Sequence, residues 1–167
     1  MSAPQFSWNK FSRSIIIHKK TDDVFPLIAT AHGLTAWLLE AASFFTMVHE
    51  TQLLNFSFPT DHESYHWVWK GKSYELQGKV LGCDVEKKSF SFTFGEECTV
   101  DIVLTEHEGN TLLKLTQQAV KGKTYDQMRQ VNSYAYWTFF LTNLKSVAEY
   151  EVDLREDTFI LPDLLNI

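Results

Sequence analysis

Cysteine, clustered basic residues and long apolar runs are all scarce in this sequence of 167 residues. Its two cysteines, Cys83 and Cys98, stand in no CxxC or Cys-His spacing, so the sequence gives no sign of thiolate metal or redox chemistry. Two isolated cysteines are typical of a protein from a reducing compartment, and we expect a cytoplasmic location. The longest purely aliphatic run, Ile15 to Ile17, is far too short for a membrane span or a signal-peptide core.

Positive charge is also sparse, since 15 Lys and Arg stand against 21 Asp and Glu, and the formal net charge is -6. A nucleic-acid footprint needs a basic stripe, so we expect no nucleic-acid partner. The sequence contains no GxSxG motif and no glycine-rich phosphate loop. His62 and His66 are separated by roughly 13 Å in an extended segment, a spacing that does not suit a metal site. We therefore assign no catalytic residue, no metal and no cofactor.

Aromatic residues are abundant in contrast, at 14% of the chain, with 13 Phe and 5 Trp. These side chains are large and stiff, so a domain that holds many of them has either a bulky core or a cavity lined with ring faces. A chain of this length can bury roughly two thirds of the surface that its unfolded form exposes. We expect residues 1–167 to form one domain.

The N-terminal region predicts one strand and two short helices. Three β-branched residues in a row predict a strand over Phe11 to His18. Thr21 has the character of a helix N-cap, because two acidic residues and an apolar run follow it. Pro26 removes a backbone donor within that run, so the pattern predicts a short or bent helix. A second short helix is predicted from Leu34 to about Ala41.

Patterns with a period of two fill the middle of the chain and predict an antiparallel sheet. We expect strands over residues 51–58, 65–70, 73–83, 89–94, 99–105 and 111–118. The clearest alternation, Ser89 to Phe94, stacks three Phe on one face and three small hydroxyl residues on the other. Gly78 interrupts its strand pattern, which indicates a bulge or a close backbone approach.

One long amphipathic helix is predicted over Tyr134 to Arg155. Its apolar stripe consists of Trp137, Phe140, Leu141, Leu144, Val147 and Ala148. A sheet with one apolar face needs a covering layer. The simplest architecture is an α+β fold in which a curved antiparallel sheet of six or seven strands grips this helix.

The region between the sheet and this helix is the candidate ligand-binding site. Its predicted lining consists of Trp37, Trp67, Trp69, Phe90, Phe92, Phe94, Trp137, Phe140, Leu141 and Leu144. Two interpretations stay open. Protein interiors are normally close-packed, so these side chains can simply fill the core. Alternatively they surround an apolar cavity suited to a lipid, a polyketide or an aromatic metabolite.

An apolar tail, residues 156–167, follows the predicted core of about residues 13–155. Phe139 lies on the side of the long helix opposite Trp137. It can dock this tail, or join it in a contact with a second copy or a partner. We expect a monomer or a weak homodimer formed through the tail.

Three segments, in order, resemble the activator of heat shock protein 90 ATPase homologue family. They are Gly78-Lys79-Val80 with Asp84 and Phe90 to Phe94, then TVDIVLTEHEGNTLLKLT from Thr99 to Thr116, and then the long helix from Trp137 to Asp153-Leu154-Arg155. The resemblance covers about residues 13 to 155. It implies the helix-grip fold of the wider START-like (SRPBCC) superfamily, which includes lipid-transfer domains, plant hydrophobic-ligand proteins and polyketide cyclases.

Two positions depart from the pattern of the family that the sequence resembles. The family usually has Gly where this chain has Tyr136, before the helix Trp, and again where it has Glu151. Both are structural positions, so they bear on the sub-family more than on the fold.

Three functions remain as hypotheses. The first is the binding of a hydrophobic small molecule between sheet and helix. The second, implied by the resemblance, is a protein-interaction module that acts as a co-chaperone on a heat-shock ATPase. The third is an enzyme of the cyclase or hydrolase kind. A binder needs a cavity, an activator needs an exposed patch, and an enzyme needs an ionisable pocket residue with a perturbed pKa.

Overall fold

The structure is a computed structural model that describes residues 7–72, 74–123 and 126–157. The strands are β1 (Lys10–Ile17), β2 (Ala41–Phe45), β3 (Ser64–Val68), β4 (Glu75–Asp84), β5 (Ser89–Phe94), β6 (Cys98–His107) and β7 (Asn110–Ala119). The α-helices are α1 (Thr21–Ala29), α2 (Ala31–Trp37) and α3 (Gln127–Tyr150), and a short 3-10 turn spans Lys70–Lys72. None of the described helices is long and apolar enough to cross a membrane.

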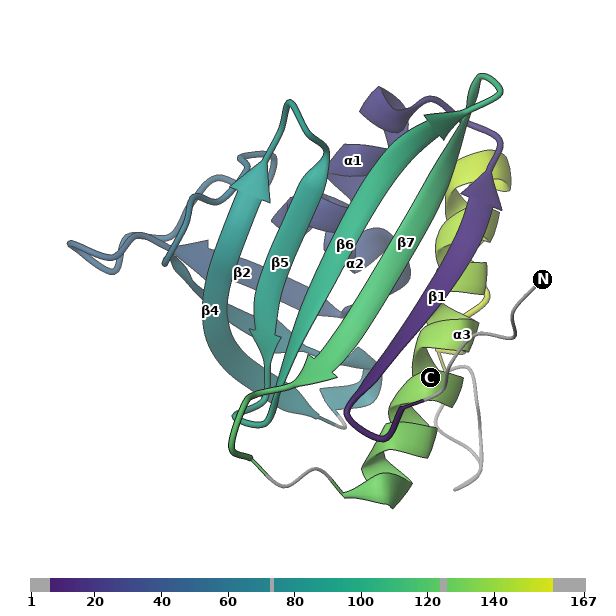
Figure 1. The fold of residues 1–167 in the computed structure, drawn as a ribbon. Coiled ribbons are helices and arrows are strands. Elements are labelled where there is room, and N and C mark those ends of the chain that lie inside the picture. The colour runs from purple at the N-terminus through teal and green to yellow at the C-terminus, as the bar shows by residue number, and fades with distance from the viewer. Residues whose placement is uncertain (1–6, 73, 124–125, 158–167) are drawn as a thin grey trace.

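The strands join in one antiparallel sheet with the order β1-β7-β6-β5-β4-β3-β2. The β6–β7 hairpin turns through Glu108 and Gly109, whose φ values of 52° and 77° match a two-residue type I′ turn. All three helices lie on the same face of the sheet, with α1 and α2 behind its middle and α3 along the β1 side (Figure 1). The sequence prediction of a curved sheet that packs against a C-terminal helix is confirmed.

Three tryptophans form the centre of the core, since Trp37, Trp67 and Trp137 are each 0% exposed. A buried N–H group needs an acceptor. Trp137 Nε1 donates to Gln117 Oε1 at 2.7 Å, and Trp37 Nε1 donates to the carbonyl of Leu27 at 2.8 Å. These bonds fix two indoles, one on α2 and one on α3. All three tryptophans belong to one hydrophobic cluster that also contains Phe44, Phe90 and Phe92.

One predicted strand is wrong. The structure has no strand over residues 51–58, and the position beside β3 is taken by β2, where the sequence predicted the end of a helix. Leu54 and Phe56 are 80% and 72% exposed, and of this alternating apolar set Phe58 packs against the core, on Phe25. Leu53 N donates to the carbonyl of Phe44 at 2.8 Å, which holds this segment beside the end of β2. An alternating pattern does not show whether a pairing strand is available.

The helix ends also differ from the prediction. Thr21 is the first residue of α1 rather than its N-cap, and α1 is short, as Pro26 predicted. The long helix begins earlier than Tyr134, at Gln127, where the Asp126 side chain accepts a hydrogen bond from Met128 N at 2.9 Å. It ends at Tyr150. The first turns of α3 are polar and have no apolar period, so the pattern did not include them.

Gly78 allows a close contact inside the sheet, as its place in the strand pattern predicted. It is paired with Tyr65, and a Cβ at Gly78 would lie 2.4 Å from the Tyr65 hydroxyl oxygen and 2.5 Å from Thr93 Oγ1. The irregularity in the β4–β5 register lies further along, between Val80 and Gly82. Gly78 therefore lets the Tyr65 ring cross β4 toward β5, where its hydroxyl donates to the carbonyl of Thr93.

Candidate functional site

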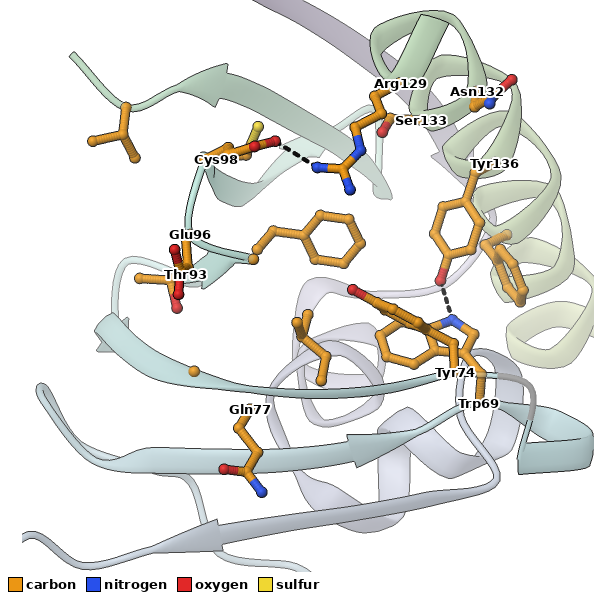
Figure 2. A pocket seen from close by; sticks show the side chains of 17 residues that line it. Trp69, Tyr74, Gln77, Thr93, Glu96, Cys98, Arg129, Asn132, Ser133 and Tyr136 are labelled. Carbon is orange, nitrogen blue, oxygen red and sulfur yellow. Dashed lines mark hydrogen bonds and ion pairs between the residues drawn. The ribbon is translucent and has the colours of Figure 1, made fainter. Parts of the chain in front are cut away.

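A groove of about 1110 Å³ opens between the first half of α3 and the ends of β4, β5 and β6 (Figure 2). This volume is at the upper end of the roughly 300–1,000 Å³ that small-molecule sites usually have. The inner wall is formed by the rings of Trp69, Tyr74, Phe94, Tyr136 and Phe140. The polar rim includes Gln77, Glu96, Glu97, Arg129, Asn132 and Ser133. We call this site the aromatic groove.

The rings of the inner wall pack against one another. The ring centroids of Tyr136 and Phe140 are 4.4 Å apart, and those of Trp69 and Tyr74 are 5.2 Å apart. Phe94 contacts both Trp69 and Tyr136, at centroid distances of 6.3 and 6.4 Å. Tyr74, which is 54% exposed, forms the solvent side of the wall. Because each ring is held by its neighbours, the wall is preformed and presents flat apolar surfaces.

Trp69 and Tyr136 are joined by a hydrogen bond from the indole Nε1 to the phenolic oxygen. Burial raises the pKa of Tyr136 far above its ordinary value, although the hydrogen bond from Trp69 acts in the opposite direction. The hydroxyl therefore keeps its proton at neutral pH and remains a donor. It is a polar point in the otherwise apolar inner wall.

Arg129 and Glu97 face each other across the rim, with Arg129 Nη1 2.6 Å from Glu97 Oε2. The hydrogen bond with Glu97 and its negative charge raise the pKa of Arg129 above its ordinary value. Among the lining residues that the structure describes, Arg129 is the only cation. The pair connects α3 to the turn between β5 and β6 and places charge at the mouth of the groove.

The structure separates the ten predicted site residues into two groups. Trp69, Phe94 and Phe140 line the aromatic groove. The others are buried in the hydrophobic core and do not line it: Trp37, Trp67, Phe90, Phe92, Trp137, Leu141 and Leu144. The two groups meet where Phe94 packs on Trp137, with ring centroids 5.5 Å apart. Side chains thus occupy the region between the middle of the sheet and α3, and the groove lies where α3 begins.

Metal and nucleophilic chemistry find little support in the described residues. They contain no group of three His, Cys, Asp or Glu side chains placed to hold a metal ion. His66 Nε2 instead lies 3.1 Å from Glu75 Oε2. Burial, reinforced by the nearby carboxylates of Asp61 and Asp84, raises the pKa of Cys83 to about 11. Its thiol therefore stays protonated at neutral pH and is a poor nucleophile.

A family model matches residues 20–149, which is more than half of the chain. The family is described as Activator of Hsp90 ATPase homolog 1-like protein. The chain belongs to this family. The resemblance found in the sequence is thereby confirmed. None of the curated proteins compared with the chain matches it.

Solved structures share the fold of this activator-like chain at low sequence identity. Protein SSP2350 of Staphylococcus saprophyticus is 15% identical with a TM-score of 0.66, and the match covers 87% of this chain and 96% of that one. The Aha1 dimer of Colwellia psychrerythraea is 18% identical with a TM-score of 0.62, covering 84% and 96%. A conserved protein of unknown function from Enterococcus faecalis is 15% identical with a TM-score of 0.60, covering 85% and 72%. At these identities the likeness shows the fold.

The two departures from the activator-like family pattern have different structural consequences. Glu151 has a left-handed backbone with φ 58° and ψ 29° immediately after α3, the conformation in which glycine is favoured. Tyr136 instead extends a large ring from α3 into the groove, where it packs against Phe94 and Phe140. The first departure affects the helix end, whereas the second shapes the site.

Several groove residues were not part of the sequence prediction. Arg129, Asn132 and Ser133 precede the predicted start of the long helix, and Glu96 and Glu97 lie between two predicted strands, 89–94 and 99–105. One signal could have found the first three. Together with Tyr136 they stand at i, i+3, i+4 and i+7, the spacing of one helix face, behind the helix-capping residue Asp126.

Proposed function

We propose that this chain binds a hydrophobic small molecule with an aromatic body in the aromatic groove. The observation that carries the proposal is a groove of about 1110 Å³ with five aromatic side chains on its inner wall and polar groups on its rim. Ligand sites usually combine such an apolar wall with a few polar groups that fix orientation. Of the ligand classes considered from the sequence, aromatic metabolites and polyketides fit flat ring faces better than a lipid chain does.

The inner wall supports binding over catalysis. Proton transfer at neutral pH needs a group whose pKa lies near 7. Tyr136, the polar group of the inner wall, has its pKa raised by burial and keeps its proton. It can donate a hydrogen bond to a ligand, but it does not act as a base. A cyclase or hydrolase activity is therefore the weaker candidate.

The test is a two-dimensional amide NMR titration of the labelled protein with N-phenyl-1-naphthylamine, a flavonoid and a fatty acid. We expect saturable shifts for the first two compounds, confined to residues 93–98 and 129–140. Phe94→Ala should weaken both titrations, since it removes a ring from the middle of the wall. Shifts that stay absent at millimolar ligand, or that spread without saturation, would overturn the proposal.

A second candidate is contact with a heat-shock ATPase, as the family description suggests. One observation favours it. Part of the loop between β2 and β3 extends away from the sheet (Figure 1), and the exposed apolar side chains of this loop include Met47, Val48, Leu54 and Phe56. Exposed apolar groups of this kind are typical of protein contacts. Addition of the purified chaperone should broaden amide signals of residues 46–56 if this role is correct, and should leave them unchanged if it is not.

We also propose that residues 1–167 form one domain with a core of about residues 13–155, and that the protein acts in the cytoplasm. The single hydrophobic cluster links β1 at one end of the sheet to β2 at the other and to all three helices. Both cysteines are free, which suits a reducing compartment. A single cooperative urea transition seen by both fluorescence and circular dichroism would support one domain, and two separate transitions would contradict it.

A further inference from the structure

We propose that the aromatic groove is selective for ligands with an anionic head, and that this head takes the place of Glu97 on Arg129. This inference rests on the proposed function, because it names the ligand class of the same groove. It concerns a ligand with an aromatic body against the inner wall and a carboxylate, sulfonate or similar group at the rim.

Arg129 has unused hydrogen-bonding capacity beside the groove. A guanidinium carries five N–H donors. Within the described residues the Arg129 side chain makes one hydrogen bond, from Nη1 to Glu97 Oε2. The contact is therefore monodentate, and Figure 2 shows the guanidinium extending from α3 toward the turn between β5 and β6, at the mouth of the groove. A planar guanidinium can bind an oxyanion through two parallel hydrogen bonds, a stronger arrangement than the one it has.

Glu97 can leave this contact at small cost. The side chains of Arg129 and Glu97 are 64% and 36% exposed, and exposed ion pairs contribute little to stability. On leaving, the Glu97 carboxylate returns to water at the rim. A ligand anion gains the same charge contact and is also held by its aromatic body against the inner wall. The exchange therefore favours a ligand that has both parts over a free anion.

The spacing along α3 sets the size of such a ligand. Arg129, Asn132, Ser133 and Tyr136 share one face of the helix and all line the groove. Arg129 and Tyr136 are two turns apart, which corresponds to roughly 10 Å along the axis. An anionic head at Arg129 thus places a body of two or three fused or linked rings between the rim and the Tyr136 hydroxyl. That hydroxyl remains protonated and can donate to a polar group at the far end.

The acidic residues of the rim determine how an anion can bind at the groove. Glu96 also lies on the rim, so with Glu97 in place the mouth carries more negative than positive charge. An anion is therefore not attracted by the general field of the rim. It binds Arg129 best when Glu97 has left the guanidinium, and removal of the Glu97 charge should improve binding more than removal of the Glu96 charge.

Two fluorescent probes with the same body test this inference. N-Phenyl-1-naphthylamine is neutral, and 8-anilino-1-naphthalenesulfonate adds a sulfonate to the same anilinonaphthalene body. We expect Arg129→Gln to lower the affinity for the sulfonate about tenfold, the loss of one charge-assisted contact, and to change the affinity for the neutral probe much less. Glu97→Gln should raise the affinity for the sulfonate severalfold. Glu96→Gln, the matched control, should have a smaller effect, and Arg129→Lys should restore only part of the loss.

The outcomes separate this inference from the proposed function. Failure of both probes to bind the wild-type protein would remove both. Binding of the neutral probe, with equal sulfonate affinity in wild-type and Arg129→Gln proteins, would overturn the anionic selectivity alone. Equal gains from Glu96→Gln and Glu97→Gln would show a general charge effect and overturn the exchange at Arg129. Amide spectra of each variant establish that it is folded before its affinities are compared.

Discussion

The indole Nε1 of Trp69 donates a hydrogen bond to the hydroxyl of Tyr136, and this contact joins the end of β3 to the first half of α3. It closes the inner end of the aromatic groove (Figure 2). The hydrophobic core lies directly behind this contact, since Tyr136 also packs on the buried Trp137 with ring centroids 5.1 Å apart. The pair is therefore the boundary between the groove and the core.

Removal of the Tyr136 hydroxyl should weaken this boundary. We expect Tyr136→Phe to lower the free energy of unfolding by about 1 kcal/mol, since it leaves a largely buried Trp69 N–H without its acceptor. Urea denaturation measures the change. Tyr74→Phe is the matched control on the exposed side of the same wall and should change stability by less than about 0.5 kcal/mol. Equal effects in the two variants would contradict the boundary role.

Substitutions at two phenylalanines of β5 should distinguish a core position from a groove position. Phe92 is 1% exposed in the core, whereas Phe94 is partly exposed and lines the groove. We expect Phe92→Ala to cost about 3 to 5 kcal/mol of stability and to leave the affinity of the folded protein for N-phenyl-1-naphthylamine nearly unchanged. Phe94→Ala should cost less stability and reduce that affinity. Denaturant melts and probe titrations measure both quantities, and the reverse assignment would show that the groove is misplaced.

Replacement of Glu151 by glycine should stabilise the protein. Glu151 has φ 58° after the last turn of α3, and its N–H donates to the carbonyls of Ser146 and Val147. Glycine adopts this conformation without the steric cost of a Cβ, so we expect a gain of about 0.5 to 1 kcal/mol. Glu151→Ala is the control, because it removes the charge near the helix C-terminus but keeps the Cβ. A larger gain from alanine than from glycine would assign the effect to charge.

Asp153 should make stability depend on pH in the acid range. Partial burial by itself would raise the pKa of Asp153, but hydrogen bonds from Arg155 and Asn143 outweigh it and lower the value to about 2. The folded protein therefore holds this carboxylate in its charged form more strongly than the unfolded chain does. The stabilisation is complete above about pH 5, decreases as the pH falls below the unfolded pKa of 3.8, and is lost as the pH falls through the folded pKa of about 2.

The variant Asp153→Asn measures this contribution. At pH 7 we expect it to cost about 1 to 2 kcal/mol, a range that allows for solvent screening of a side chain that is 34% exposed. At pH 3 the cost should be clearly smaller, since the unfolded chain then binds a proton on this carboxyl that the folded protein does not bind. Urea melts of both proteins at the two pH values give the comparison. A cost that is independent of pH would contradict the lowered pKa.

The Asp153–Arg155 segment makes contacts that a local sequence pattern cannot predict. The predicted long helix included both residues, and they form an ion pair at 2.8 Å just after the helix ends. The structure adds that Arg155 is buried and donates to the carbonyls of Thr35 in α2 and Leu39 just after it. Those partners are more than a hundred residues away, so no local pattern could reveal them.

The sequence by itself determined the fold. Alternating strands such as Ser89 to Phe94 and the apolar stripe around Trp137 and Leu144 specify which faces must be buried, and burial of those faces permits few arrangements. The edge strand was not determined in this way, because AASFF and the segment 51–58 are both short and apolar.

Only the tertiary structure decided which aromatic side chains remain beside open space. Phe92 and Phe94 occupy equivalent places in the pattern, yet the first is enclosed by Trp67 and Phe90 while the second faces the groove. Burial drives both toward the same face, and how far α3 covers that face depends on helix position. Polar residues such as Arg129 join the site for the same reason, since a helix that extends past its apolar stripe places them at the mouth.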